Sequence, residues 1–349
     1  MSGRARNFFD HLHSGQVRRR VLHPLTTCGL GIAALTCLAV LFVTGSTLFF
    51  YYVPDQTQAY ERILHISTTL RFGRLIRNLH YLSANALLVI VVLHLSRIFL
   101  MGSYKQRRLN WIYGLVLLLL ILFANFTGYL LPWDQISYWA VKVGASLASY
   151  FPVLGPTLRT FLLGGPDVGP ETLTRSFALH AAVLPFLLLI FTALHLWRVR
   201  KDGGLALPEI ENEERLPAVP WLFRAEAAVA LLVLAALIGL ALIVDAPIFE
   251  RADPAHPPNP AKAPWYFVGF QELVSYSAMI GGIIVPVMLV AFLLFAPFLD
   301  RSCSSGGLWL TADRWRWNLA FTLLLFSQVV LIIAGLFLRG PNWQLLLPF

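Results

Sequence analysis

Four histidines occupy apolar stretches of the chain: His80 and His94 in one stretch, His180 and His195 in another. Ionisable side chains at membrane depth are costly, and by default they indicate a functional site. At about 100° per residue, the fourteen residues from His80 to His94 return to within about 40° of the same helical face, and the fifteen from His180 to His195 overshoot it by about 60°. Each helix should therefore carry two imidazoles on one broad face, about 21 Å apart along its axis.

If the two helices pack antiparallel, His80 lies level with His180, and His94 lies level with His195. Two opposed imidazoles can ligate the iron of a planar porphyrin from both faces, which leaves no axial position for oxygen. The spacing therefore predicts two bis-histidine haem sites, at which His80, His94, His180 and His195 are the metal ligands and electrons are transferred. The alternative is four unrelated histidines that form interhelical hydrogen bonds or line a proton path.

Two pairs of glycines share the fourteen-residue spacing: Gly31 with Gly45, and Gly114 with Gly128. A porphyrin inside a four-helix bundle needs neighbouring backbones to come close, and glycine removes the side chains that would prevent this. Ordinary small-residue packing between membrane helices is the alternative. The shared spacing favours the haem interpretation.

Three arginines near the ends of the predicted helices could pair with haem propionates. Arg77 and Arg97 each lie three residues from a histidine of the same helix, and Arg175 lies five residues before His180. For each arginine, a charged head that merely reaches the membrane interface is the alternative.

The composition shows which kind of element must position these residues. Of the 349 residues, 57% are hydrophobic and only 13% are charged, against about 25% charged in soluble domains. This composition excludes a soluble enzyme, a disordered chain and, despite the net charge of +9, a nucleic-acid-binding module. The three cysteines match neither a disulfide framework nor a zinc motif.

Seven apolar segments are each near the length of about 20 residues that a helix needs to cross a bilayer. They are roughly 28–52, 77–101, 111–131, 177–199, 224–245, 278–299 and 317–338. We therefore expect an all-α, multi-pass membrane protein, with a four-helix di-haem bundle followed by three further transmembrane helices. The linker around 202–220 divides the chain into domains at 1–207 and 208–349.

Basic residues predict the orientation of these helices. The side that holds the N-terminus carries 17 of the 27 lysines and arginines, including Arg4 and Arg6. The positive-inside tendency then predicts a cytoplasmic N-terminus in the inner (cytoplasmic) membrane. The two longest connections, about 132–176 and 246–277, would both lie outside, where their aromatic composition argues against disorder.

With these motifs, the chain resembles the cytochrome b family of quinol-oxidising bc-type complexes. The resemblance rests on Arg77-x-x-His80, His94-x-x-Arg97, the glycine pairs, Pro185 five residues after His180, and the run GYLLPWDQISYWAVK (128–142). That run, the fifteen-residue histidine spacing and LTRSFALH (173–180) look most like the chloroplast-type cytochrome b. The three-helix part after the linker looks like the partner subunit of that type, fused to it.

The resemblance implies quinol oxidation at the outer face. One electron would leave through a Rieske-type iron–sulfur protein to a c-type cytochrome. The other would pass the outer haem and then the inner haem to reduce quinone near the cytoplasmic face, with proton release outside and uptake inside. The resemblance also implies a homodimer within a larger complex, surrounded by membrane lipid and without a nucleic-acid partner.

The sequence departs from the family at the outer quinol site. The family carries Pro-Glu-Trp-Tyr there, whereas this chain reads Ala263-Pro264-Trp265-Tyr266, and proline cannot accept a proton. Glu272 is the nearest carboxylate downstream, and we expect it to take over as proton acceptor with a pKa raised by partial burial. A purely structural pairing of Glu272 is the alternative.

Aromatic residues of both long outer loops are expected to line the quinol pocket. Trp265, Tyr266 and Phe267 come from one loop, and Tyr138 and Trp139 come from the other. Tyr138 and Tyr266 are also candidate catalytic side chains, because mostly apolar pockets with a few polar groups are typical of small-molecule sites. The interfacial aromatic belt of membrane proteins is the alternative.

A second departure concerns Cys28. Chloroplast-type chains attach a further haem through a cysteine near the cytoplasmic end of the first membrane helix, and alignment on Gly31 and Gly45 places that position at Gly29. One residue turns a helical side chain by about 100°. The offset argues against a covalent third haem at Cys28, although it does not exclude one.

Two other functions compete with the bc-type interpretation. A di-haem membrane anchor would pass electrons between quinone and a dehydrogenase or reductase without bifurcation, and would need neither the PWDQISYWA segment nor the WYF loop. A haem-free transporter would need intramembrane carboxylates or broken helices. The predicted helices contain almost no acidic residues, which argues against a transporter.

Overall fold

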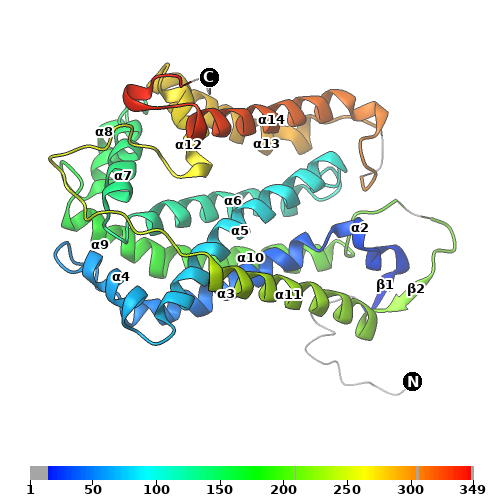
Figure 1. Ribbon diagram of the computed structural model, residues 1–349. Coiled ribbons are helices and arrows are strands. Elements are labelled where there is room, and N and C mark those ends of the chain that lie inside the picture. The colour runs from blue at the N-terminus through cyan, green and yellow to red at the C-terminus, as the bar shows by residue number, and fades with distance from the viewer. Residues whose placement is uncertain (1–14, 209, 304–305, 347–349) are drawn as a thin grey trace.

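The computed structural model describes residues 15–208, 210–303 and 306–346 (Figure 1). Within these ranges, seven helices are long and apolar enough to cross a membrane, in agreement with the seven predicted segments. They span Leu30–Phe49, Gly73–Leu100, Arg108–Tyr129, Pro170–Lys201, Ala218–Ile243, Ile280–Leu299 and Ala312–Phe337. The all-α membrane fold is confirmed.

The first four of these helices form a bundle. Helix α3 (Leu30–Phe49) packs along α5 (Gly73–Leu100), and α6 (Arg108–Tyr129) packs along α10 (Leu184–Lys201). Their surfaces are apolar all round, as expected for helices that face lipid on one side and protein on the other. The fourth span begins as α9 (Pro170–Ala178), with proline at its first position, where no helical N–H is needed.

The last three membrane helices do not form a unit of their own. Helix α11 (Ala218–Ile243) packs against α3 and α5 of the bundle, whereas α14 (Trp315–Phe337) packs against the short α12 (Trp265–Val274). Helix α13 (Val285–Leu299) contacts α6. In Figure 1, α13 and α14 accordingly lie together on one side of α6 and α5, away from α11.

Two π-helical turns interrupt the membrane helices: η2 (Leu179–Val183) before α10, and η3 (Ile280–Ile284) before α13. A proline follows each turn as the second residue of the next helix, Pro185 and Pro286. Proline has no N–H to donate and crowds the carbonyl four residues earlier, so the preceding turn widens. The sequence therefore places a π turn at His180.

The two long loops meet at one end of the molecule, with α4 (Ala59–Thr68), α7 (Gln135–Ala148), α8 (Gly155–Leu163) and η5 (Pro341–Trp343) (Figure 1). The loop after α11 is tied to the start of α7. The Gln135 N–H donates to the Glu250 carbonyl at 2.7 Å, and the Ala252 N–H donates to the Trp133 carbonyl at 3.2 Å. We call this the loop end of the molecule.

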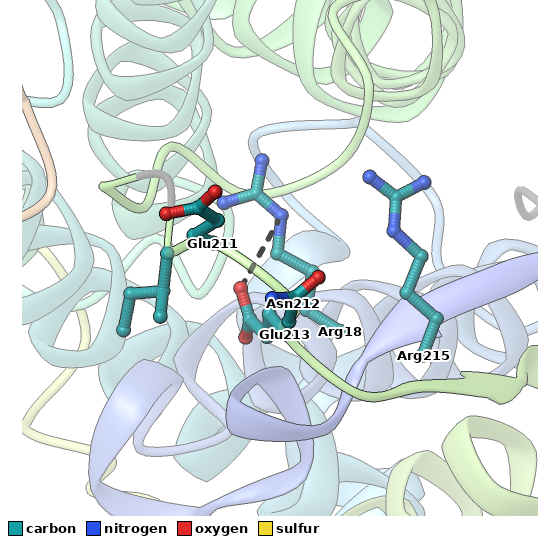
Figure 2. A pocket seen from close by; sticks show the side chains of 6 residues that line it. Arg18, Glu211, Asn212, Glu213 and Arg215 are labelled. Carbon is teal, nitrogen blue, oxygen red and sulfur yellow. Dashed lines mark ion pairs between the residues drawn. The ribbon is translucent and has the colours of Figure 1, made fainter.

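At the opposite end, the predicted linker is held against the N-terminal arm. Strand β1 (Gln16–Arg18) pairs antiparallel with β2 (Arg215–Pro217), and the short helices η1 (Arg19–Leu22) and α2 (Pro24–Thr27) follow. Arg20 forms an ion pair with Glu213 at 2.8 Å. Figure 2 shows Arg18, Glu213 and Arg215 around a surface pocket of about 560 Å³ beside this pairing. Arg4 and Arg6 lie outside the described residues.

A buried ion pair joins the two halves of the chain at this arm end. Arg314, in the turn η4 (Ala312–Arg314), donates to the Asp300 carboxylate at 3.0 Å, and the Tyr104 hydroxyl donates to the same oxygen at 2.7 Å. The loop after α5 and the loop after α13 therefore lie side by side.

Candidate functional site

The structure brings His80 and His180 together near the loop end of the bundle. Their ring centroids lie 6.0 Å apart, with the ring planes at 73°. His80 comes from α5, and His180 comes from the π turn η2. We call these two residues the outer pair, after the predicted orientation.

His94 and His195 form the corresponding inner pair. His94 lies on α5, fourteen residues after His80. His195 lies on α10, close enough to His94 for the two side chains to interact electrostatically. The two levels expected from the sequence are thus present in the structure, each with one histidine from each helix.

The π turn explains why two unequal spacings produce matched levels. A π turn holds about one residue more than an α turn. The fifteen residues from His180 to His195 therefore turn the helix by about as much as fourteen regular residues, because one is absorbed at residues 179–183. The 60° overshoot expected for a regular helix does not apply.

Each of the four glycines lies beside one of the four histidines. The pairs are Gly45 with His80, Gly128 with His180, Gly114 with His195 and Gly31 with His94. A Cβ on Gly45 would lie 3.1 Å from Cε1 of His80, and a Cβ on Gly128 would collide with the His180 ring. These glycines admit the imidazoles close to the neighbouring helix backbone, which is the contact that a side chain would block.

Hydrogen bonds orient the outer imidazoles. Nδ1 of His180 donates to the carbonyl of Ala124 at 2.9 Å, and Nδ1 of His80 lies 2.9 Å from Oγ1 of Thr44. At the inner pair, Nδ1 of His94 is buried and completes no hydrogen bond within the described residues, whereas His195 lies against the backbone of Asn110. In the outer pair, Nε2 is therefore the nitrogen left to ligate a metal.

These residues fit a haem at each level. Within the described residues, no three His, Cys, Asp or Glu side chains gather as a metal site made only of protein ligands would need. A facing pair of imidazoles supplies two ligands, so the remaining ligands must come from the bound group, as the four nitrogens of a porphyrin would supply them. The glycines provide the close backbone approach that such a group needs.

The three candidate arginines are hydrogen-bonded to backbone carbonyls. Arg77, which is buried, donates to the carbonyls of Ala246 and Pro247 at 2.9 and 2.5 Å. Arg97, also buried, donates to the Thr26 carbonyl at 2.8 Å, and Arg175 donates to the Phe161 carbonyl at 2.7 Å. Pairing of these arginines with haem propionates stays a prediction.

The aromatic residues of α12 lie beside the outer level of the bundle. Nε1 of Trp265 donates to Oδ1 of Asn85 at 2.6 Å, and Asn85 follows His80 by five residues on α5. Trp265 and Tyr266 both pack against an apolar cluster that includes Leu87 and Leu88 of α5. The ring of Phe267 makes an edge contact with Phe126 of α6, with centroids 6.1 Å apart.

Helix α7, which carries Tyr138 and Trp139, also contacts Phe126. A Cβ on Gly144 of α7 would lie 3.0 Å from the Phe126 ring. Tyr138 is buried against Trp133, and Nε1 of Trp139 donates to the Asp253 carbonyl at 3.2 Å. Phe126 packs in the apolar cluster that contains Tyr138 and Trp139, and its ring also contacts Phe267, so it links α7 to α12.

The expected raised pKa of Glu272 is wrong. Its carboxylate is buried and accepts hydrogen bonds from Arg339, from Nε1 of Trp343 at 2.9 Å and from the Tyr276 hydroxyl at 3.4 Å. The Arg339 guanidinium and these donors hold the pKa of Glu272 below its usual value, against the opposing effect of burial. Arg339 lies 67 residues away in the chain, so helix periodicity carried no sign of it.

Several polar residues that shape the site were not singled out from the sequence. Asp134 caps α7 through the Ser137 N–H at 2.9 Å and also accepts the Phe249 N–H at 3.2 Å. The Asp-x-x-Ser pattern was a recognisable capping signal. Thr44, next to Gly45, carried no signal that its hydroxyl would face His80. Cys28, with an exposed thiol, directly precedes Gly29 and the start of α3.

The fold and the paired sites define a class: a multi-pass helical bundle with two histidine pairs stacked across the membrane. Two family models match this chain. "Cytochrome b/b6/petB" covers residues 21–203, and "Cytochrome b(C-terminal)/b6/petD" covers residues 251–346. The whole of α11 lies between the two matched ranges. The chain belongs to the cytochrome b/b6 family.

Individual relatives agree with the family models. The cytochrome b6 of Acaryochloris marina (strain MBIC 11017) is 42% identical over 175 residues, which are 50% of this chain and 81% of that protein. The cytochrome b6 of Mastigocladus laminosus is 41% identical over the same share of both chains. A chain of a solved structure described as "Hyperthermophilic respiratory Complex III" has a TM-score of 0.80 and 27% identity, and the match covers 92% of this chain and 86% of that one.

Proposed function

We infer that the chain is the cytochrome b-type subunit of a bc-type quinol oxidoreductase complex in a membrane. Its family and the fold it shares with a respiratory complex support this function over a haem-free transporter or a simple di-haem anchor. The finer assignment that we propose is two b-type haems, one held by His80 and His180 and one held by His94 and His195. The observation that carries it is that each of the four histidines faces its own glycine.

When bound, each haem supplies an iron that gains and loses one electron. The chain's own residues position and shield these groups. The four imidazoles would hold the two haems at two levels of the bundle, and the apolar helices would exclude water from them. Arg77, Arg97 and Arg175, near the ends of their helices, are proposed to bind the propionates. The outer pair lies toward the long loops and the inner pair toward the N-terminal arm, so electrons would cross from a quinol site at the loop end to a quinone site at the arm end.

We propose that the quinol-oxidation pocket lies between α7 and α12, near the outer pair. Trp265, Tyr266 and Phe267 support one wall and Tyr138 and Trp139 the other, with Phe126 between them. In this arrangement Tyr266 and Tyr138 are the polar groups nearest to a bound ring, in a setting that is otherwise apolar. Trp265 donates a hydrogen bond to Asn85 of α5, the helix that also carries His80.

A photoreactive quinone analogue tests this location. We expect its covalent label within residues 130–145 and 262–276, because these segments provide the aromatic walls. Peptide mass mapping of the labelled complex measures the site, with excess unlabelled quinol as the competitor that removes specific labelling. Competed label found only elsewhere in the chain would contradict the proposed pocket.

We propose the remaining assignments from the charge pattern and the family. The N-terminal arm would face the cytoplasm, across the inner (cytoplasmic) membrane, because its side is the more basic. A Rieske-type iron–sulfur protein and a c-type cytochrome would accept electrons at the loop end, and two copies of the chain would form a homodimer. The functional division at 1–207 and 208–349 also stays a proposal, whereas the one-residue offset argues against a covalent third haem at Cys28.

The role of Glu272 is open to a direct test. If Glu272 mainly stabilises the fold through Arg339, Glu272→Gln should lower the stability of the purified complex by roughly 3 kcal/mol, since it leaves a nearly buried guanidinium uncompensated. The lowered pKa means that this stabilisation is complete at neutral pH and is lost as the pH falls below about 4. The difference between wild type and variant should therefore shrink on acidification.

Thermal unfolding at several pH values measures this difference, and quinol turnover is measured in parallel. Glu61→Gln is the matched control, because Glu61 is exposed and lies 3.9 Å from its arginine partner. A Glu272→Gln protein of unchanged stability that has lost turnover would contradict the structural role and would support Glu272 as the proton acceptor.

A further inference from the structure

The two histidine pairs differ in what their Nδ1 atoms contact. Both outer imidazoles have a hydrogen-bond partner at Nδ1. At the inner level, Nδ1 of His94 has none within the described residues, and His195 lies against the backbone of Asn110. The partner of His180 is a backbone carbonyl, which any residue at that position would provide. The partner of His80 is a side chain, the hydroxyl of Thr44, so this contact depends on the sequence.

The direction of the Thr44 hydrogen bond follows from its second contact. Oγ1 of Thr44 lies 2.7 Å from the carbonyl of Val40, which can only accept. The single hydroxyl proton is therefore given to Val40, and the oxygen accepts from Nδ1–H of His80 at 2.9 Å. This arrangement places the ring proton of His80 on Nδ1 and leaves the lone pair of Nε2 directed away from α3.

Thr44 is built into this position. Its side chain is buried, with 5% of the residue exposed, and it precedes Gly45, the glycine that admits the His80 ring. A hydrogen bond accepted from Nδ1–H makes an imidazole a stronger electron donor through Nε2. A stronger donor stabilises the oxidised iron more than the reduced iron, and so lowers the reduction potential of the group that it ligates.

We propose that Thr44 is a positioning residue that fixes the tautomer of His80 and, through it, lowers the reduction potential of the outer haem relative to the inner one. This inference rests on the proposed bis-histidine assignment. Nδ1 of His94, the corresponding residue of α5 at the inner level, has no such partner within the described residues, so this contact acts on the outer level alone.

The test is a redox titration of the two b-haem absorbance bands in purified Thr44→Val. Valine keeps the shape of threonine and removes the hydroxyl. We expect the outer haem to be easier to reduce, with a change in its reduction equilibrium of at least threefold, where tenfold corresponds to 59 mV for one electron. The inner haem should be unchanged, and Thr44→Ser should restore the wild-type value.

Thr36→Val is the matched control, because the Thr36 hydroxyl makes the same hydrogen bond within α3, to Ile32 at 2.9 Å. If Thr44→Val does not assemble, Thr44→Ala removes the hydroxyl without adding volume and is titrated in its place. Two haems with unaltered potentials, or an equal shift in Thr44→Ser or Thr36→Val, would overturn the inference. Absence of two b-type haems from the wild-type protein would instead overturn the assignment on which it rests.

Discussion

His94→Ala should reduce the haem content of the purified protein from two b-type haems per chain to one. The inner level would retain only the His195 imidazole, and a single axial ligand holds the iron poorly. The outer level should keep its haem, since His80 lies about 21 Å from His94 along α5, and both outer imidazoles have their own hydrogen bonds. A pyridine haemochrome assay, normalised to protein, measures the change.

His65→Ala is the control for this variant. His65 lies on the short helix α4 with an exposed side chain, and its removal should leave both haems in place. Two b-type haems per chain in His94→Ala would refute the inner assignment. Loss of both haems with retention of the fold would mean that the two levels do not load independently.

Gly128→Val should remove the outer haem and spare the inner one. Even a Cβ at this position collides with the His180 ring, so a branched side chain must push the imidazole away from the Ala124 carbonyl that orients it. Overpacking of this kind costs about 1–3 kcal/mol in a well-packed core, and here the cost falls on the geometry of a proposed ligand. The loss should be visible in the reduced-minus-oxidised spectrum as well as in the haem count.

Gly239→Val provides the matched control, because Gly239 also lies in a membrane helix, and a Cβ placed on it would have no atom within 4 Å. That variant should retain both haems. Equal haem loss in Gly128→Val and Gly239→Val would indicate a general effect of valine in these helices, and would count against a specific role for the glycine beside His180.

The membrane helices and the histidine levels could be predicted because they depend on local periodicity. The length of an apolar segment is enough to predict a membrane helix. The near-equal spacing of His80–His94 and His180–His195 predicts that each helix carries two histidines on one face. The π turn at His180 could also have been anticipated, since Pro185 follows His180 by five residues and proline disturbs the preceding helical turn. It resolves the one-residue mismatch that a regular helix leaves between the two spacings.

Contacts between distant segments could not be read from the sequence in the same way. Periodicity places Glu272 on a face of α12, but its pKa is set by Arg339, which reaches it only because the chain after α14 folds back onto α12. Arg77 likewise binds carbonyls of a loop that follows α11, about 170 residues later. Helix α11 packs on the first bundle, across the predicted domain boundary. This is also a contact between distant segments, which local periodicity does not predict.

The most direct test of the central claim is the amount and type of haem in the purified wild-type protein. Acidified acetone extracts b-type haem and leaves thioether-linked haem on the chain, so pyridine haemochrome assays of both fractions also decide the question of Cys28. The account predicts two extractable b-type haems per chain, with the low-spin electron paramagnetic resonance signals of bis-histidine iron. One haem or none per chain, or high-spin signals from a five-coordinate iron, would contradict the assignment of the four histidines to two haems.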